Sequence, residues 1–258
     1  MHPFFRTRAA AVAALVMVAG CSVPGPEGAP GGIHDPYEAG NRKVHAFNRG
    51  IDRAVLRPVS HGYGKVATDD LQVAVGNVAT NLATPGIMVN NLLQGDIPGF
   101  GKNLYRLVIN TTLGIGGIFD PAAELGGVQL ADADFGGTLA KWGFPEGAYL
   151  ELPMMGPSTE RDAAGKLVDF FTNPLSYTLP SPERHVGTVA RVFDRVGDRE
   201  RFGDTIDSVL YDSADSYAQS RLIYLQARRF ELGGDAPSNY DDPYSSSVTD
   251  PSEDPYAE

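Results

Sequence analysis

The chain has 258 residues, of which 32 are acidic and 21 are basic, so its formal net charge at neutral pH is −11. This negative charge argues against nucleic acid as a partner, because phosphate binding requires clustered lysine and arginine. The single cysteine excludes a disulfide within the chain.

Residues 1–20 are predicted to be a lipoprotein signal peptide. Arg6 and Arg8 precede an apolar segment that is too short to span a bilayer by itself. Small residues then lead to Cys21, the place at which a lipoprotein signal peptidase cleaves and the thiol accepts lipid. An ordinary secretory signal with a chance cysteine is the alternative. Ser22 favours passage to the outer membrane of a Gram-negative cell.

Biased segments flank the expected fold on both sides. Residues 21–34 are rich in proline and glycine and are interpreted as a flexible tether between the lipid and the fold. Residues 233–258 carry seven carboxylates and no basic residue, which is typical of a disordered acidic tail. The sequence therefore predicts one domain, at residues 35–232.

The first half of this domain has the pattern of amphipathic helices. Asp35 is interpreted as an N-cap, and the helix that it opens is expected to end at Pro58. Thr68 or Asp69 opens a second helix, and Thr84 caps a short third one. The apolar residues recur at helical spacing: Val44, Phe47, Ile51 and Val55, then Leu71, Val75, Val78 and Leu82, and then Phe100, Leu104 and Leu107.

Residues 110–157 form an unusual central segment. It holds ten glycines in 48 residues, where ordinary usage of about 7% would give roughly three. Apolar residues stand between the glycines, so we expect an apolar chain folded through many tight bends. Strand signals are scarce, and only residues 149–152 suggest a short extended piece. The expected fold class is therefore mainly α, with amphipathic helices around a glycine-rich apolar centre.

The last helix is expected at residues 213–232. Four of its side chains share one face at helical spacing: Tyr217, Arg221, Tyr224 and Arg228. Such a stripe can bind anionic headgroups, because guanidinium groups match phosphate oxygens. A partly exposed face with cation–π contacts is the alternative.

No catalytic or metal-binding motif is visible. The histidines lack metal-ligand spacing, and no G-x-S-x-G motif marks a serine hydrolase. Asp132 and Asp134 lack a third acid at the spacing of a calcium loop and are interpreted as solvated loop residues. We therefore expect neither an enzyme, a metal nor a cofactor, although residues distant in sequence can converge.

The segments resemble the MlaA/VacJ family of outer-membrane lipoproteins in their order and spacing. The matching pieces run through the whole expected domain: Asp35-Pro36-Tyr37-Glu38, Asn41-Arg42, Phe47-Asn48, Arg57-Pro58-Val59, Asn90-Asn91-Leu92-Leu93-Gln94-Gly95, Asn110-Thr111-Thr112-Leu113-Gly114, Asp134-Phe135-Gly136, Trp142-Gly143, Gly156-Pro157-Ser158, Arg161-Asp162, Asp215, Tyr217, Arg221 and Tyr224. Two features depart from the pattern of the family. One is Pro145, where the family often has glycine, and the other is the acidic tail.

The resemblance implies a ring-like helical domain in the periplasmic leaflet of the outer membrane. An amphipathic channel would remove phospholipids misplaced in the outer leaflet and so maintain lipid asymmetry. The lipids would pass to a soluble periplasmic carrier of the same pathway, and family members associate with trimeric porins. A structural lipoprotein that scaffolds a porin complex and a lipid-anchored periplasmic hydrolase are the alternatives.

One hypothesis assigns a gate to the central segment. The bend at Gly143 and Gly147 would position an apolar flap formed by Trp142, Phe144 and Tyr149, and the flap would control lipid passage. Gly143 can adopt backbone angles closed to other residues. The alternative is that these aromatic residues are ordinary core and that Gly143 only makes a tight turn.

Replacing Cys21 with alanine tests the predicted anchor. We expect Cys21→Ala to abolish acylation and to leave the protein uncleaved or mislocalised, because the thiol is the lipid acceptor. Intact mass and membrane fractionation measure the effect, with the conservative exchange Ser22→Thr as the control. Unchanged mass and unchanged outer-membrane fractionation would contradict the lipoprotein prediction.

Overall fold

The computed structural model describes residues 33–178, 180–182 and 185–233. The predicted signal peptide, Cys21 and the tether up to residue 32 lie outside the described residues, as does the acidic tail after Gly233.

Helices dominate the described chain, which confirms the mainly α prediction, and the strands form one antiparallel hairpin. The elements are α2 (Glu38–Ile51), η2 (Asp52–Leu56), α3 (Arg57–Val66), α4 (Asp69–Leu93), α5 (Ile97–Thr112), α6 (Pro121–Glu124), α7 (Phe135–Lys141), β1 (Tyr149–Leu152), β2 (Gly156–Thr159), α8 (Glu160–Thr172), α9 (Leu175–Thr178), α10 (Val186–Arg201), α11 (Gly203–Asp207), η4 (Ser208–Asp212) and α12 (Ser216–Glu231).

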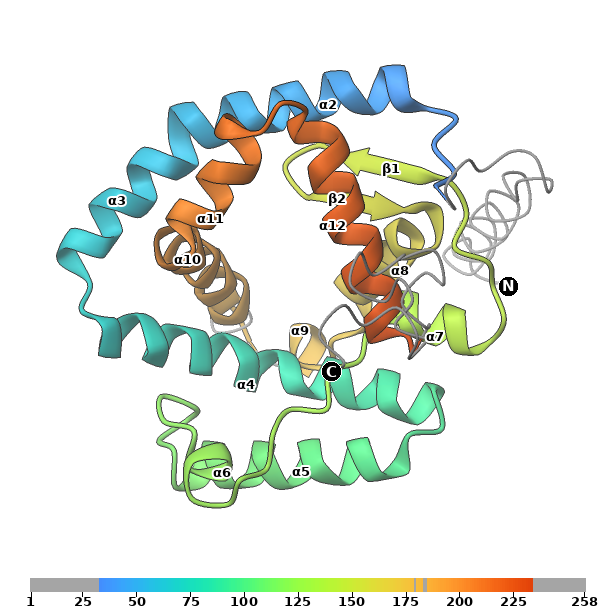
Figure 1. Ribbon diagram of the computed structural model, residues 1–258. Helices are drawn as coiled ribbons and strands as arrows, with labels where there is room; N and C mark the ends of the chain where they lie inside the picture. The colour runs from blue at the N-terminus through green and yellow to red at the C-terminus, as the bar shows by residue number, and fades with distance from the viewer. Residues whose placement is uncertain (1–32, 179, 183–184, 234–258) are drawn as a thin grey trace, which may run out of the picture.

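The helices are arranged as a ring (Figure 1). The continuous rod of α2, η2 and α3 forms one side, α4 with α5 beneath it forms the opposite side, and α10 and α12 stand between them. Helix α10 packs against α3 and α4, α5 packs against α4, and α7 packs against α8. Within the part of the chain that the structure describes, no helix has the length and apolarity needed to cross a membrane.

The first rod differs from its prediction at both ends. The structure places Tyr37 at the N-cap of α2 without a side-chain cap, so the assignment of that role to Asp35 is wrong. The predicted helix end at Pro58 is also wrong. Pro58 lies in the first turn of α3, and the π-helical η2 directly before it joins α2 to α3 without a break.

Helix α4 is longer than expected, because a proline again fails to end the helix. Thr68, one of the two residues predicted to open it, is its N-cap, and its hydroxyl accepts a hydrogen bond from the backbone N–H of Leu71. The predicted break at Thr84-Pro85 is wrong, because Pro85 lies inside the helix. The Thr84 hydroxyl donates to the carbonyl of Thr80 at 2.8 Å and so does not cap a new helix.

The polarity of the fold is inverted relative to an ordinary soluble domain. Among the described residues, polar and charged side chains outnumber hydrophobic ones in the buried set, and most of the buried hydrophobic residues are alanine. The apolar stripes of the helices instead carry many exposed side chains, including Phe47, Val55, Leu71 and Leu104. So much exposed apolar surface marks contact with a membrane or a partner.

Buried amides hold the glycine-rich centre against α5. Asn103 is fully buried, and its amide donates to Asn91 at 2.7 Å and to the carbonyl of Ala131 at 2.8 Å. Arg106 pairs with Asp120 at 2.6 Å, and the amide of Asn110 donates to the same carboxylate at 2.8 Å. Polar contacts therefore hold the bends of this segment in place.

A buried ion-pair cluster joins the first rod to the C-terminal helices. Arg199 of α10 donates to both carboxylate oxygens of Asp52 in η2, at 2.8 and 3.0 Å, and to Asp207 at 2.6 Å. The hydroxyl of Tyr211 in η4 donates to Asp52 at 2.7 Å. Burial alone would raise the pKa of Asp52, but the hydrogen bonds from Arg199 and Tyr211 outweigh it and lower that pKa.

Removing the cation from this cluster tests its importance. We expect Arg199→Met to lower the free energy of unfolding by about 3 kcal/mol, because it leaves the buried Asp52 without its partner. Arg201→Met is the matched control on the same helix. Its pair with Asp198 is exposed, so the expected loss is below about 1 kcal/mol. Equal unfolding curves for the two variants would contradict this account.

A polar pocket beside an exposed aromatic loop

The Tyr/Arg stripe shares one face of α12, as the spacing predicts, but this face points into the protein. Tyr217 is 2% exposed, and its hydroxyl bonds to Asp35. Arg221 pairs with the same carboxylate, and its guanidinium lies 5.2 Å from the centre of the Tyr217 ring. The sequence did not reveal Asp35 as a partner, because its position before a proline resembled a helix cap.

The second half of the stripe is held by Asp162 at the start of α8. The Tyr224 hydroxyl donates to Asp162 at 2.6 Å, and the Arg228 guanidinium donates to both oxygens of that carboxylate at 3.1 Å. Arg228 also donates to Asp134 at 2.7 Å. Burial opposes the charge of Arg228, but its bonds to Asp134 and Asp162 raise its pKa above the ordinary value. Arg228 is therefore a fixed cation.

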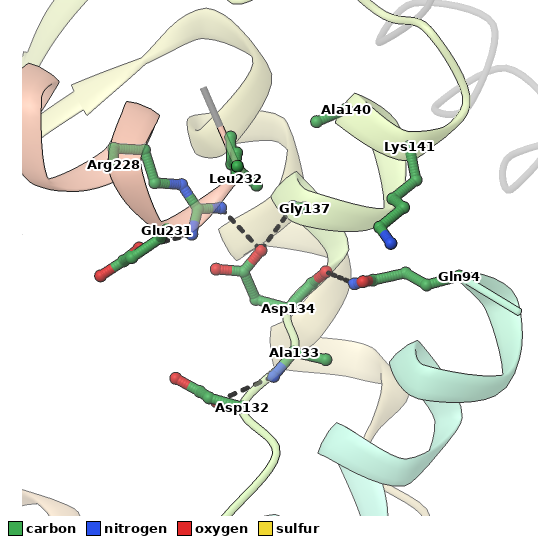
Figure 2. A pocket seen from close by; sticks show the side chains of 11 residues that line it. Gln94, Asp132, Ala133, Asp134, Gly137, Ala140, Lys141, Arg228, Glu231 and Leu232 are labelled. Carbon is green, nitrogen blue, oxygen red and sulfur yellow. Dashed lines mark hydrogen bonds and ion pairs between the residues drawn. The ribbon is translucent and has the colours of Figure 1, made fainter. Parts of the chain in front are cut away.

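Arg228 lines a cavity of about 570 Å³ between α4, α7 and the C-terminal end of α12. Figure 2 shows Asp134 between Arg228 and the backbone N–H of Gly137, which it caps at 2.6 Å. The amide of Gln94 donates to the carbonyl of Asp134 at 3.2 Å. This pocket, which we call the polar pocket, is lined by Gln94, Asp132, Ala133, Asp134, Gly137, Ala140, Lys141, Arg228, Glu231, Leu232 and Gly233.

Charges of both signs line the polar pocket. Asp132 and Glu231 stand on one side of Asp134, and Lys141 extends from α7 on the other (Figure 2). Desolvation and the neighbouring charge of Asp134 raise the pKa of Asp132. Asp132 and Asp134, interpreted from the sequence as solvated loop residues, thus belong to the pocket. Among the described residues, no group of three or more His, Cys, Asp or Glu could hold a metal ion.

The loop predicted as a gate begins at the edge of the polar pocket. Trp142 follows Lys141 directly and is 51% exposed, and its indole N–H donates to the carbonyl of Leu93 at 3.0 Å. Gly143 has a φ of +86°, a conformation that favours glycine. Phe144 is half-buried. Trp142 faces outward. The alternative that the aromatic residues of this loop are ordinary core is therefore wrong for Trp142.

The structure does not bring Tyr149 to this loop. Tyr149 is 1% exposed on β1 and packs with Tyr217 and Leu225 of α12. Its hydroxyl donates to Glu151 at 2.5 Å. Gly147, with a φ of +76°, directs the chain from the loop into the strand. Trp142 and Phe144 thus remain as the aromatic side chains of the predicted flap, whereas Tyr149 is core.

A second cavity, of about 580 Å³, lies between α4 and α10 and is almost wholly apolar. Its lining includes the exposed side chains of Leu71, Val186, Val189 and Phe193. The predicted apolar stripe of α4 therefore meets apolar side chains of α10 here to form a groove, which we call the apolar groove.

The sequence profile described as MlaA lipoprotein matches residues 33–231. The chain belongs to this family. The match spans every helix and strand of the described chain.

Similar proteins occur in several bacteria. The intermembrane phospholipid transport system lipoprotein MlaA of Escherichia coli K12 is 30% identical over 239 residues, or 91% of this chain and 92% of the relative. An uncharacterised protein of Rickettsia typhi is 35% identical over 209 residues, or 81% of each chain. A structure solved in work on the structural basis for maintenance of bacterial outer membrane lipid asymmetry matches with a TM-score of 0.66 and 30% identity. The match covers 77% of this chain and 98% of that one.

Gly143 separates the gate interpretation from a simple turn. A side chain there would meet nothing within 4 Å, so Gly143→Val should cost only backbone strain, about 1–3 kcal/mol. We expect this variant to increase sensitivity to detergent and EDTA at near-normal protein abundance, because the loop can no longer move freely.

Gly127→Val is the matched control for this variant. Gly127 also has a positive φ, +62°, and open space around it, but it lies outside the loop. An intact barrier in Gly143→Val cells, or equal sensitivity in both variants, would contradict the gate.

Proposed function

We propose that this chain is a lipoprotein of the outer membrane that maintains lipid asymmetry. It removes phospholipids misplaced in the outer leaflet through an amphipathic passage and delivers them to a soluble periplasmic carrier. Cys21 anchors it in the periplasmic leaflet of a Gram-negative cell. Its family membership supports this proposal, because relatives carry the name intermembrane phospholipid transport system lipoprotein.

The inverted polarity is the observation that carries the proposal. A protein that exposes large apolar side chains on many helices loses solubility in water but gains favourable contacts in hydrocarbon. With no spanning helix in the described residues, this surface suits a body immersed sideways in one leaflet. The polar pocket at the C-terminal end of α12 then offers a headgroup a hydrophilic place within that body.

The two cavities differ in polarity as the two ends of a phospholipid do, and they lie at opposite ends of α4. The polar pocket presents Lys141 to a phosphate and Asp132 to an ammonium group, whereas Arg228 pairs with Asp134, Asp162 and Glu231. The apolar groove offers hydrocarbon side chains to acyl chains. Trp142 lies beside the polar pocket, where an aromatic residue with one polar atom suits the border between lipid and water.

The partners follow from the same proposal. The exposed apolar helices provide surface for a trimeric porin as well as for lipid. Transfer itself requires no covalent step, because the lipid leaves chemically unchanged.

Lipid bound to the purified protein tests the proposal. We expect phospholipid to co-purify with the detergent-solubilised protein and to be detected by mass spectrometry. Lys141→Glu should reduce it several-fold, because the pocket loses a cation that meets the phosphate. Lys102→Glu, an exposed lysine on α5 outside the polar pocket, is the matched control. Lipid-free protein that still holds a porin would contradict the proposal and support a scaffold.

A further inference from the structure

Three residues distant in the sequence form a connected row behind a pocket at the N-terminal end of α12. The Ser216 hydroxyl lies 3.1 Å from Nε2 of His45. Nδ1 of the same ring lies 3.3 Å from Oε1 of Glu151. The order of groups is therefore hydroxyl, imidazole and carboxylate, with α12, α2 and β1 each supplying one.

This arrangement has the geometry of an activated serine. A nucleophile within hydrogen-bonding reach of a base, with the base oriented by a third group, is the general signature of nucleophilic catalysis. The carboxylate requires the proton on Nδ1, which leaves Nε2 free to accept the proton of Ser216. The position of each hydrogen follows from the network.

The row is held from several sides. Glu151 accepts further hydrogen bonds from the Tyr149 hydroxyl at 2.5 Å and from the Asn48 amide at 3.3 Å. The His45 ring packs edge-on against the Tyr217 ring, with centroids 5.7 Å apart. Because the side chains of His45 and Glu151 are 7% and 2% exposed, the imidazole has little freedom to turn away from the serine.

Ser216 and His45 line an open cavity of about 360 Å³. The other residues that line it include Arg42, Arg49, Ser213 and Asp215. Nη1 of Arg49 lies 3.2 Å from the Ser216 hydroxyl oxygen. This cation therefore donates a hydrogen bond to the nucleophilic oxygen and favours negative charge there when the hydroxyl proton leaves.

We propose that Ser216, His45 and Glu151 form a hydrolytic site for short-chain carboxylic esters, distinct from lipid transport. The cavity has the volume of a small ligand site, and the cation beside the nucleophilic hydroxyl favours loss of its proton. Ser216 is the nucleophile, His45 the general base and acid, and Glu151 the residue that positions the imidazole.

The reaction proceeds in two balanced steps. Ser216 forms a bond from its oxygen to the ester carbonyl carbon while His45 takes the hydroxyl proton. The bond from carbon to the leaving alcohol oxygen then breaks, and His45 returns the proton to that oxygen. Water repeats the sequence on the acyl-serine, and the products are a carboxylic acid and the free serine.

The sequence motifs could not show this site. The serine lies in no G-x-S-x-G elbow, and the three residues are separated by 106 and 65 positions along the chain (151 − 45 and 216 − 151). Only the packing of α2 between β1 and the start of α12 brings them together.

Covalent labelling tests the proposal directly. The full protein in detergent is treated with a fluorophosphonate, whose phosphorus bonds to an activated serine oxygen with loss of fluoride. We expect one label per chain, at Ser216 by peptide mass, and hydrolysis of p-nitrophenyl acetate above the uncatalysed rate. Ser216→Ala should abolish both. Glu151→Gln should lower the hydrolysis rate by roughly 100-fold or more, because the imidazole loses its orienting charge.

Ser208→Ala is the matched control, because Ser208 lies outside the cavity and its hydroxyl donates to the carbonyl of Thr205 at 2.8 Å. Labelling and hydrolysis should be unchanged in this variant. Thermal unfolding of each variant confirms that it is folded before it is labelled. Folded wild-type protein that takes no label and hydrolyses no ester would overturn the proposal, as would label that persists in Ser216→Ala.

Discussion

The structure depends on a polar interior in which almost every buried group must find a partner. A buried amide or charge without a hydrogen bond costs several kcal/mol in a medium of low polarity, so these side chains specify where each element sits. Asn103 fixes the centre to α5, Arg199 fixes η2 to α10, and Asp162 fixes α8 to α12. Hydrophobic packing alone would not position the helices so specifically.

This interior leaves the outer surface free to be apolar. The stripes of α4, α5 and α10 carry exposed Leu, Val and Phe side chains, and in hydrocarbon these need no further cover. Hydrogen bonds become more favourable in such surroundings, because water no longer competes for their donors and acceptors. A membrane environment would therefore cover the apolar surface and strengthen the hydrogen bonds of the interior.

Helix α12 connects the two sites that we assign. Its C-terminal end places Arg228 in the polar pocket, and its N-terminal end places Ser216 beside His45. The twelve helical steps from Ser216 to Arg228 span about 18 Å at 1.5 Å per residue. Between these ends, the face of Tyr217, Arg221 and Tyr224 is occupied by carboxylates. One helix thus carries the polar pocket at one end and the proposed ester site at the other.

The sequence by itself determined the helical class and the glycine bends, because periodicity and backbone freedom are local properties. It also limited the start of α4 to Thr68 or Asp69 and placed the shared face of α12 correctly. The resemblance identified the family, because many short segments of the sequence matched it in a fixed order.

Only the tertiary structure decided which way each face points and which distant groups meet. Helical spacing groups the apolar residues without saying whether lipid or protein lies beside them. The sequence predicted that Pro58 and Pro85 interrupt their helices. In the structure Pro85 lies inside α4, and Pro58 lies in the first turn of α3 directly after η2. The partnership of Asp162 with Arg228 and that of His45 with Ser216 link positions far apart along the chain. No local signal encodes such pairs, since they form only when the whole chain is packed.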